Sequence, residues 1–152
     1  NEPGKISLGK GSNQLELARM LFGETRDVNN GKYCGLVGST ALVRQKRSKL
    51  DLKEVLYAPN QYTCFTEKDP NFSFVVDPLH NSDNHPKDRQ VWEMMYNLAG
   101  KILNNGAIEQ VTHYWVEPTV KEPYWAKGKE PKIEFPHPND ERGRITRFYD
   151  LA

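Results

Sequence analysis

Glu24 is the side chain whose position in the sequence most directly suggests chemistry. At about 100° per residue it falls in line with Leu17, Met20 and Leu21, on the apolar side of an expected helix. Desolvation there raises the pKa of a carboxyl group, which then keeps its proton closer to neutral pH. The sequence predicts either a general acid or a structural carboxylate that pairs with Arg26 or caps the next segment.

The same helical wheel assigns the opposite side of this helix to solvent. Glu16, Arg19, Gly23 and Arg26 cluster on that side, away from the apolar stripe. We therefore expect one face packed against the core and one face in water, with Glu24 turned inward or into a cleft.

Histidine and cysteine spacing argues against a metal centre. The four histidines, His80, His85, His113 and His137, form no helical pair, and Cys34 and Cys64 lack metal-ligand spacing. The sequence predicts no metal and no cofactor. The two cysteines fit either one disulfide or two free thiols.

Length and composition favour one globular domain. The chain has 152 residues, 37% hydrophobic residues and a net charge of +1, which lacks the basic excess of a nucleic-acid-binding protein. The basic run RQKRSK (44–49) ends an expected helix, where cations suit the helix dipole. No apolar run approaches the roughly 20 residues of a membrane span, and no signal peptide is recognisable. We expect neither a nucleic-acid partner nor membrane insertion.

The elements that must position Glu24 follow from periodicity and from breakers. We expect a loose lead-in over 1–11, then a single domain over 12–152 of helix-dominated α+β class with a small extended lobe. The predicted helices are 12–26, 31–47, 51–58 and 86–105; the predicted extended segments are 72–76, 111–116 and 144–150; and a proline-rich loop covers 117–142. The second helix is apolar nearly all the way round, so it should be buried on most sides.

Five segments, in order, resemble the SleB-type cell wall hydrolases, a family of spore-cortex-lytic enzymes and of phage and bacterial peptidoglycan hydrolases. They are LARMLFGETR, VGSTALVRQKRS, LKEVLYAPNQYTCF, VTHYW with PYWAKG further on, and RFYD near the end. Two positions depart from the family pattern. Val43 stands where the family usually has Asn, and Thr146 stands where it usually has a His that orients other groups. The second departure puts full activity, or the usual substrate, in question.

The resemblance implies a lysozyme-like fold and cleavage of peptidoglycan between N-acetylmuramic acid and N-acetylglucosamine. Glu24 would be the single acid and base of a lytic transglycosylase, in which the muramic acid 6-hydroxyl attacks and a 1,6-anhydro product forms. A hydrolytic muramidase would need a second carboxylate, for which the candidates are Asp27, Glu67, Asp69 and Asp77. A glycan-binding or virion structural protein on a retained hydrolase fold is a further alternative.

The resemblance also suggests substrate-binding residues. Gln61, Tyr62 and Thr63 would bind sugar acetamido or hydroxyl groups, although Tyr62 would equally serve to anchor its loop in the core. Tyr114 would line the cleft while His113, on the other face of the strand, makes structural hydrogen bonds. Trp125 would stack on a sugar or hold the proline-rich loop. The expected partner is the peptidoglycan glycan strand, with a possible virion or cell-envelope partner. The expected location is the cell envelope, the extracellular space or a phage virion.

Overall fold

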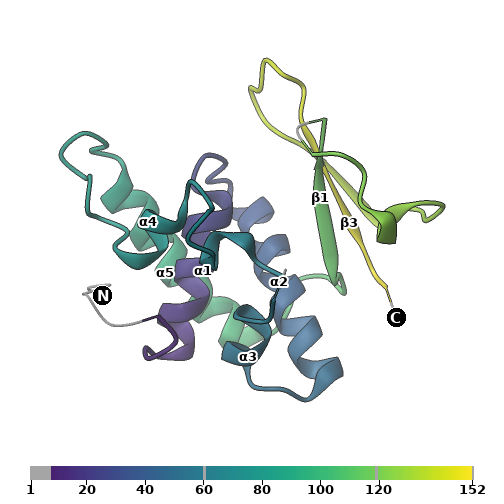
Figure 1. Cartoon of the computed structure of the whole chain (residues 1–152), viewed down its shortest axis with the longest axis horizontal. Coiled ribbons are helices and arrows are strands. Elements are labelled where there is room, and N and C mark those ends of the chain that lie inside the picture. The colour runs from purple at the N-terminus through teal and green to yellow at the C-terminus, as the bar shows by residue number, and fades with distance from the viewer. Residues whose placement is uncertain (1–7, 60, 119, 152) are drawn as a thin grey trace.

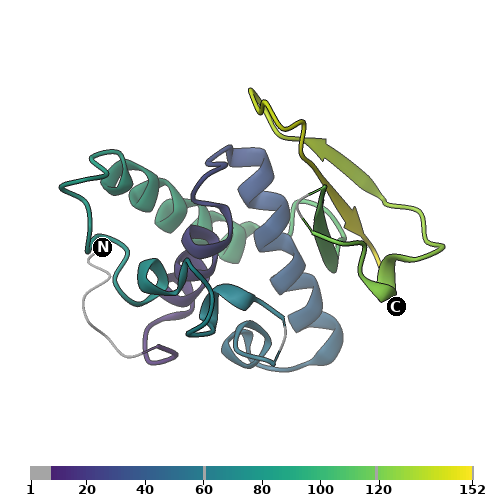
Figure 2. The same cartoon turned by 45° about the horizontal axis from the view of Figure 1, so that its top comes forward.

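Five helices and a three-stranded sheet make up this α+β protein, seen in the computed structural model of residues 8–59, 61–118 and 120–151. The helices gather on one side and the sheet stands beside them (Figures 1 and 2). The helices are α1 (Asn13–Thr25), α2 (Gly31–Ser48), α3 (Leu52–Leu56), α4 (Phe72–Val76) and α5 (Asp88–Asn105). The strands are β1 (His113–Glu117), β2 (Ile133–Pro136) and β3 (Ile145–Tyr149), and short 3₁₀ turns occur at η1 (Thr63–Phe65) and η2 (Tyr124–Ala126).

Local sequence signals explain the two central helices. Ser12 caps α1 by accepting a hydrogen bond from the Leu15 N–H at 3.1 Å, as expected for an N-cap serine. Helix α2 begins after Asn30, which caps it in the same way, and its residues 33–41 are all buried. The prediction of a helix buried on most sides is confirmed. Small residues allow this packing, since a Cβ on Gly38 would lie 2.8 Å from a methyl group of Ile102 in α5.

The prediction that one side of α1 faces water is wrong. Glu16 and Arg19 are 0% exposed, and Gly23 is also buried. The Glu16 carboxylate accepts hydrogen bonds from the backbone N–H groups of Gly9 and Gly11. The lead-in is therefore tied down at residues 9–11, where we expected a loose segment. Residues 1–7 of the predicted lead-in lie outside the described part of the chain.

The segment FSFVV, expected to be extended, forms helix α4 instead. Its β-branched and aromatic residues suit a strand, but α4 packs on α1, where Val75 is fully buried close to Gly23. One helical turn buries Val75 and leaves Val76 exposed, so tertiary packing outweighs the local preference.

The sheet has the antiparallel order β1-β3-β2, which requires a strand that the sequence analysis missed. Strand β2 lies inside the predicted proline-rich loop and pairs Phe135 with Thr146 and Ile133 with Phe148. On β1, Tyr114 pairs with Phe148 and faces the helices. His113 and Trp115 lie on the opposite face of the sheet with Tyr149.

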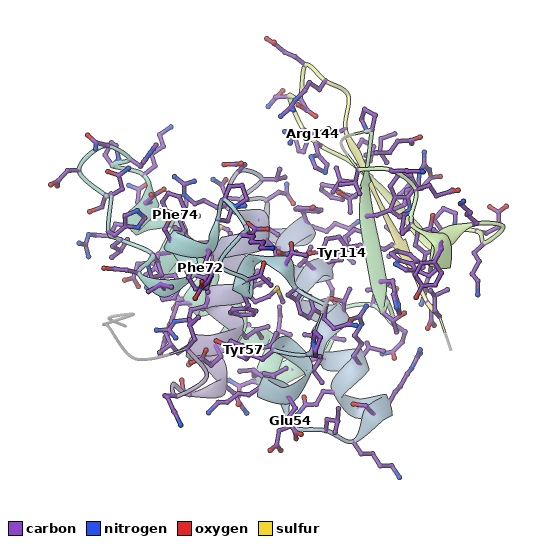
Figure 3. The ribbon with its side chains drawn as sticks, viewed as in Figure 1. Glu54, Tyr57, Phe72, Phe74, Tyr114 and Arg144 are labelled. Carbon is purple, nitrogen blue, oxygen red and sulfur yellow. The ribbon has the colours of Figure 1, made fainter. Side chains whose placement is uncertain are left out.

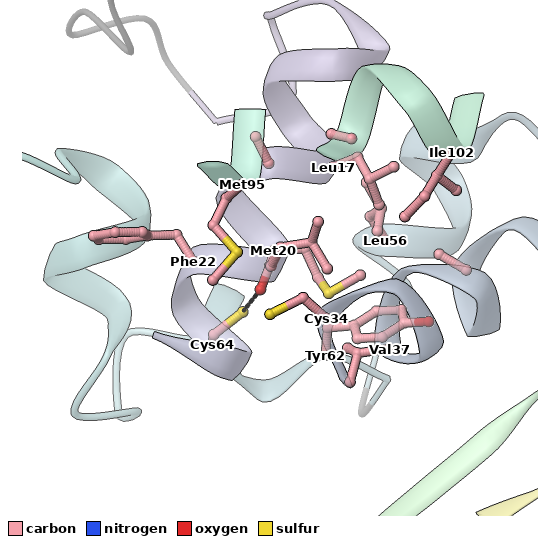
Figure 4. Close-up of a cluster of buried hydrophobic side chains, with 14 of the residues drawn as sticks. Leu17, Met20, Phe22, Cys34, Val37, Leu56, Tyr62, Cys64, Met95 and Ile102 are labelled. Atoms are coloured by element: carbon pink, nitrogen blue, oxygen red, sulfur yellow. Dashed lines mark hydrogen bonds between the residues drawn. The ribbon is translucent and has the colours of Figure 1, made fainter. Parts of the chain in front are cut away.

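One hydrophobic cluster joins the helices to the sheet, since it includes Phe148 of β3 as well as side chains from α1, α2, α3 and α5. Cys34 and Cys64 are both buried in this cluster as free thiols, and Figure 4 shows them close to Met20. Of the two alternatives for the cysteines, the structure has the free thiols. Among the described helices, none combines the length and the apolarity needed to cross a membrane.

Candidate active site

Glu24 lies near the C-terminal end of α1, where it lines a pocket of about 140 Å³. The pocket opens between the helices and the sheet, because its other walls come from α2, from β1 and from the segment that joins β2 to β3. The lining includes Tyr33, Asn71, Val116, His137 and Arg144. The inward orientation predicted for Glu24 is therefore confirmed, and the residue lies at the wall of a pocket.

Two neutral donors hold the Glu24 carboxyl group. The Tyr114 hydroxyl donates a short hydrogen bond to Oε1, and the Cys64 backbone N–H donates to Oε2 at 3.3 Å. Tyr114 extends from β1 toward the helices (Figure 3). No Lys, Arg or His side chain in the described residues forms an ion pair with Glu24. Glu24 thus has hydrogen-bond donors on both oxygens and no ion pair among the described residues.

Gly23 permits the contact between Glu24 and the Cys64 segment. A Cβ at Gly23 would lie 2.8 Å from the Cys64 Cβ and 2.9 Å from its sulfur, which is closer than real side chains approach. Only a residue without a side chain lets η1 pack directly on α1 at this point. The glycine before the glutamate is therefore part of the geometry of the site.

Burial raises the pKa of Glu24 above its ordinary value, and this desolvation is the largest cause. The hydrogen bonds from Tyr114 and Cys64 act in the opposite direction, since they stabilise the carboxylate, while the negative charge of Asp69 raises the pKa further. The effect of desolvation exceeds that of the hydrogen bonds, so the protonated form of Glu24 persists to a higher pH than in a solvated glutamate. Burial, together with the Glu24 charge, raises the pKa of Tyr114 well above its ordinary value, so the phenol stays a donor.

Two of the four candidate second carboxylates come near Glu24. Asp69 acts on it electrostatically and accepts a hydrogen bond from the Asn71 N–H at 2.8 Å. Asp27 lines the same pocket, but its side chain is 81% exposed. Glu67 is exposed, Asp77 is partly buried, and neither lines this pocket.

The predicted substrate-binding residues do not all gather at Glu24. Tyr62 is only 4% exposed and its hydroxyl bonds Thr40 Oγ1 at 2.8 Å, so it anchors its loop in the core, which is the second of the two roles expected for it. Thr63 is exposed and adjoins Cys64, whose N–H reaches Glu24. Gln61 lines a separate pocket of about 430 Å³ with Arg44 and His113.

Trp125 lies on the face of the sheet opposite to Glu24. Its ring packs on His113 and Tyr149, with centroid distances of 4.9 and 5.4 Å. It therefore holds the proline-rich loop against the outer face of the sheet, which is the second of the two roles expected for it, and the structure does not bring it to Glu24. His113 makes the expected structural hydrogen bond, from Nδ1 to Thr112 Oγ1 at 2.8 Å.

Residues that sequence reasoning missed complete the site. The imidazole of His137 lies against Thr146, with 2.6 Å between Nε2 and Oγ1, and Thr146 Oγ1 donates to the Tyr33 hydroxyl at 3.1 Å. An imidazole thus adjoins the position where the family resemblance leads one to expect a histidine, but it comes from the neighbouring segment. Alternation of Ile133 and Phe135 was the available signal, because it marks the strand that leads to His137.

Both arginines of the pocket are paired with carboxylates. Arg26 binds Asp88 through two hydrogen bonds of 3.1 and 3.3 Å and lies 3.8 Å from the centre of the Phe74 ring. Arg144 binds Asp140 in the same two-pronged way, which lowers the pKa of Asp140 to about 2. These pairs fix the pocket walls and neutralise most of their charge.

The arrangement is that of a desolvated carboxyl group at the edge of a pocket, which suits proton transfer to a bound ligand. Within the described residues, no three His, Cys, Asp or Glu side chains are grouped closely enough to hold a metal ion. Comparison with models of known families, with curated proteins and with solved structures found no match to this chain.

Proposed function

We propose that the protein cleaves peptidoglycan glycan strands between N-acetylmuramic acid and N-acetylglucosamine, with Glu24 as the general acid of a lysozyme-like domain. One observation carries the proposal: Glu24 is partly buried at a pocket, bonded to neutral donors, and in no ion pair with a described residue. A carboxyl group in such surroundings keeps its proton until a leaving group needs it. The resemblance to SleB-type hydrolases across residues 17–149 supplies the substrate class.

The reaction begins with proton transfer from Glu24 to the glycosidic oxygen. The resulting carboxylate is stabilised by the Tyr114 hydroxyl and the Cys64 N–H, which already point at its two oxygens. The 6-hydroxyl of the muramic acid then attacks the anomeric carbon and gives its proton to Glu24. This lytic transglycosylase route returns Glu24 to its starting form and needs only one carboxyl group. Attack within one molecule also benefits from proximity.

Digestion of purified peptidoglycan in oxygen-18 water, followed by mass spectrometry of the fragments, tests this route. We expect unlabelled 1,6-anhydro ends, since no water oxygen enters the product. Labelled reducing ends as the main product would exclude the transglycosylase route. An intact glycan after prolonged digestion would favour a glycan-binding or virion structural role instead.

Asp69 supports a second candidate function, that of a hydrolytic muramidase with two carboxylates. Its charge acts on Glu24, as expected of a carboxylate near the same reaction centre. In that case Asp69→Asn would lower hydrolysis by about 10²-fold or more, whereas a transglycosylase would keep most of its activity. Asp27→Asn serves as the matched variant, because Asp27 lines the pocket yet is largely exposed.

The proposed substrate places the protein at the cell envelope, outside the cell or in a phage virion. The small net charge of the chain, +1, agrees with a glycan partner rather than a nucleic acid.

A further inference from the structure

A second pocket adjoins the one at Glu24. It has a volume of about 420 Å³, within the range of about 300–1,000 Å³ that is typical of ligand sites. Its walls are the turn between α1 and α2 and the segment that joins β2 to β3. The two pockets share Asp27, Val28, His137 and Arg144 as lining residues and therefore adjoin each other, and we call the pair the hairpin groove. Arg144 marks the sheet side of this groove in Figure 3.

His137 has one nitrogen committed and one without a partner. Thr146 donates its only hydroxyl proton to Tyr33, so it must accept from His137, whose Nε2 therefore carries the imidazole proton. Nδ1 of the neutral ring is then a bare acceptor. It is buried without a hydrogen-bond partner among the described residues, while His137 as a whole is 9% exposed.

An acceptor of this kind at a pocket points to a ligand that donates. Buried polar atoms in native proteins almost always have partners, and an exception calls for an explanation. Because His137 lines both pockets, we take a ligand bound there as the partner of Nδ1. Burial and the nearby Arg144 charge lower the pKa of His137, which keeps the ring neutral and Nδ1 free to accept.

The charges of the hairpin groove select a neutral ligand. The guanidinium of Arg144 is bound by Asp140, and that of Arg26 by Asp88. Asp27 adds a negative charge at the rim, where its side chain is 81% exposed. A phosphate or a carboxylate would therefore find no uncommitted arginine among these wall residues. A neutral sugar that carries N–H and O–H donors fits the acceptor better.

We propose that His137 is a ligand-binding residue of the hairpin groove, where its Nδ1 accepts a hydrogen bond from the acetamido N–H or a hydroxyl of an N-acetylated amino sugar. The sugar class rests on the proposed function. The groove would hold the sugar next to the one whose bond Glu24 cleaves, because the two pockets adjoin and His137 lines both. Tyr33 also lines the Glu24 pocket, and its hydroxyl oxygen accepts a hydrogen bond from Thr146. Its own hydroxyl proton would donate to the same glycan strand.

Nitrogen NMR of the imidazole rings tests the proposal directly. The sample is the Glu24→Gln protein, in which we expect turnover to fall by at least about 10²-fold, and the probe is the tetramer of N-acetylglucosamine. We expect the His137 Nδ1 resonance to move progressively to saturation, while Nε2 and the exposed His85 ring change little. Saturable sugar binding without a change at Nδ1 would overturn the proposal, and so would the absence of binding at millimolar tetramer.

Two substitutions of His137 distinguish the role of Nδ1 from that of Nε2. His137→Asn keeps an acceptor oxygen near the place of Nδ1, whereas His137→Gln keeps an amide N–H near the place of Nε2 and loses the acceptor. In the Glu24→Gln background we expect His137→Gln to weaken tetramer binding about tenfold and His137→Asn to weaken it less than about threefold. Circular dichroism checks folding, and His85→Gln is the control. The reverse order would show that His137 acts only through Thr146.

These results are distinguishable from failure of the proposed function. A shift at Nδ1 together with a native protein that leaves peptidoglycan intact would reject cleavage and keep the sugar site. Cleavage by the native protein without a shift at Nδ1 would reject the sugar site alone.

Discussion

Two glutamates on α1 show how differently a fold can use the same residue type. Glu16 is 0% exposed and accepts hydrogen bonds from the Gly9 and Gly11 N–H groups and from the Tyr57 hydroxyl, at 2.6 to 3.0 Å. It also pairs with Arg19 at 3.4 Å. Glu24, two helical turns later, has one backbone N–H and one tyrosine, no ion pair within the described residues, and a pocket beside it.

The difference indicates which buried carboxylate can do chemistry. The Glu16 charge is matched by a cation and by three further donors, so its role is to join the lead-in and α3 to α1. Glu24 lacks a counter-charge and meets a cavity, so its proton can be given to a ligand. Burial alone does not distinguish the two, whereas the partner set and the access to a pocket do.

Exchange of the carboxyl group at Glu24 for an amide should have the largest effect on activity. Glu24→Gln keeps the shape and cannot give a proton, so peptidoglycan clearance should fall by about 10²–10⁴-fold. The variant should unfold at the same denaturant concentration as the native protein near pH 5. A variant that clears peptidoglycan within about tenfold of the native rate would refute the assignment of Glu24.

At alkaline pH, the Glu24→Gln variant should be more stable than the native protein. The folded-state pKa of Glu24 is raised, so its stabilising contribution is complete below the ordinary glutamate pKa and is lost as pH rises through the raised value. Above that pH the native protein must hold a desolvated charge, and the glutamine variant does not. Denaturant unfolding of both proteins at pH 5 and pH 9 measures the difference.

Glu16→Gln, in contrast to Glu24→Gln, should lower the stability of the fold and leave catalysis by the folded protein largely unchanged. It removes the negative charge of the buried ion pair with Arg19, which costs about 3 kcal/mol of unfolding free energy. Measured well below the unfolding temperature, the folded fraction should cleave peptidoglycan with a pH profile like that of the native protein. A folded Glu16→Gln protein with activity as low as that of Glu24→Gln would abolish the contrast between the two glutamates.

Gly23 and Gly11 each pack close to one of the two glutamate sites, so substitution of each by alanine gives a matched pair of variants. In Gly23→Ala the new methyl group meets Cys64 and would move its N–H away from Glu24, so activity should fall about tenfold. In Gly11→Ala the methyl group meets the Glu16 carboxylate at 2.7 Å, so stability should fall by about 1–3 kcal/mol while activity per folded molecule is kept. Equal losses of activity in both variants would contradict this division.

Tyr114→Phe should give the smallest and most diagnostic effect. The lost hydrogen bond had lowered the pKa of Glu24, so that pKa should rise further. Activity falls as pH rises through the pKa of the acid, and in the variant this decline should move to higher pH. The maximal rate should fall less than tenfold. A decline that moves to lower pH would show that Tyr114 does not stabilise the carboxylate.

Features that depend only on residues close to one another in the sequence could be predicted from the sequence. Ser12 and the apolar stripe of Leu17, Met20 and Leu21 fixed the start and the buried side of α1, and so the inward direction of Glu24. The continuous apolar character of 31–47 predicted a buried helix, and 111–116 and 144–150 contain most of the observed β1 and all of β3. Periodicity succeeds in these places because side-chain direction follows from the backbone repeat alone.

Only the tertiary structure decided which polar groups meet. The helical wheel placed Glu16 and Arg19 in water because it contains no information on residues 9–11 and α3, which cover them. The approach of His137 to Thr146 depends on the register of β2 with β3, and that of Cys64 to Glu24 depends on a glycine without a Cβ. The partner set of a buried carboxylate is made by segments distant in sequence, and it sets the pKa and the access that separate Glu24 from Glu16.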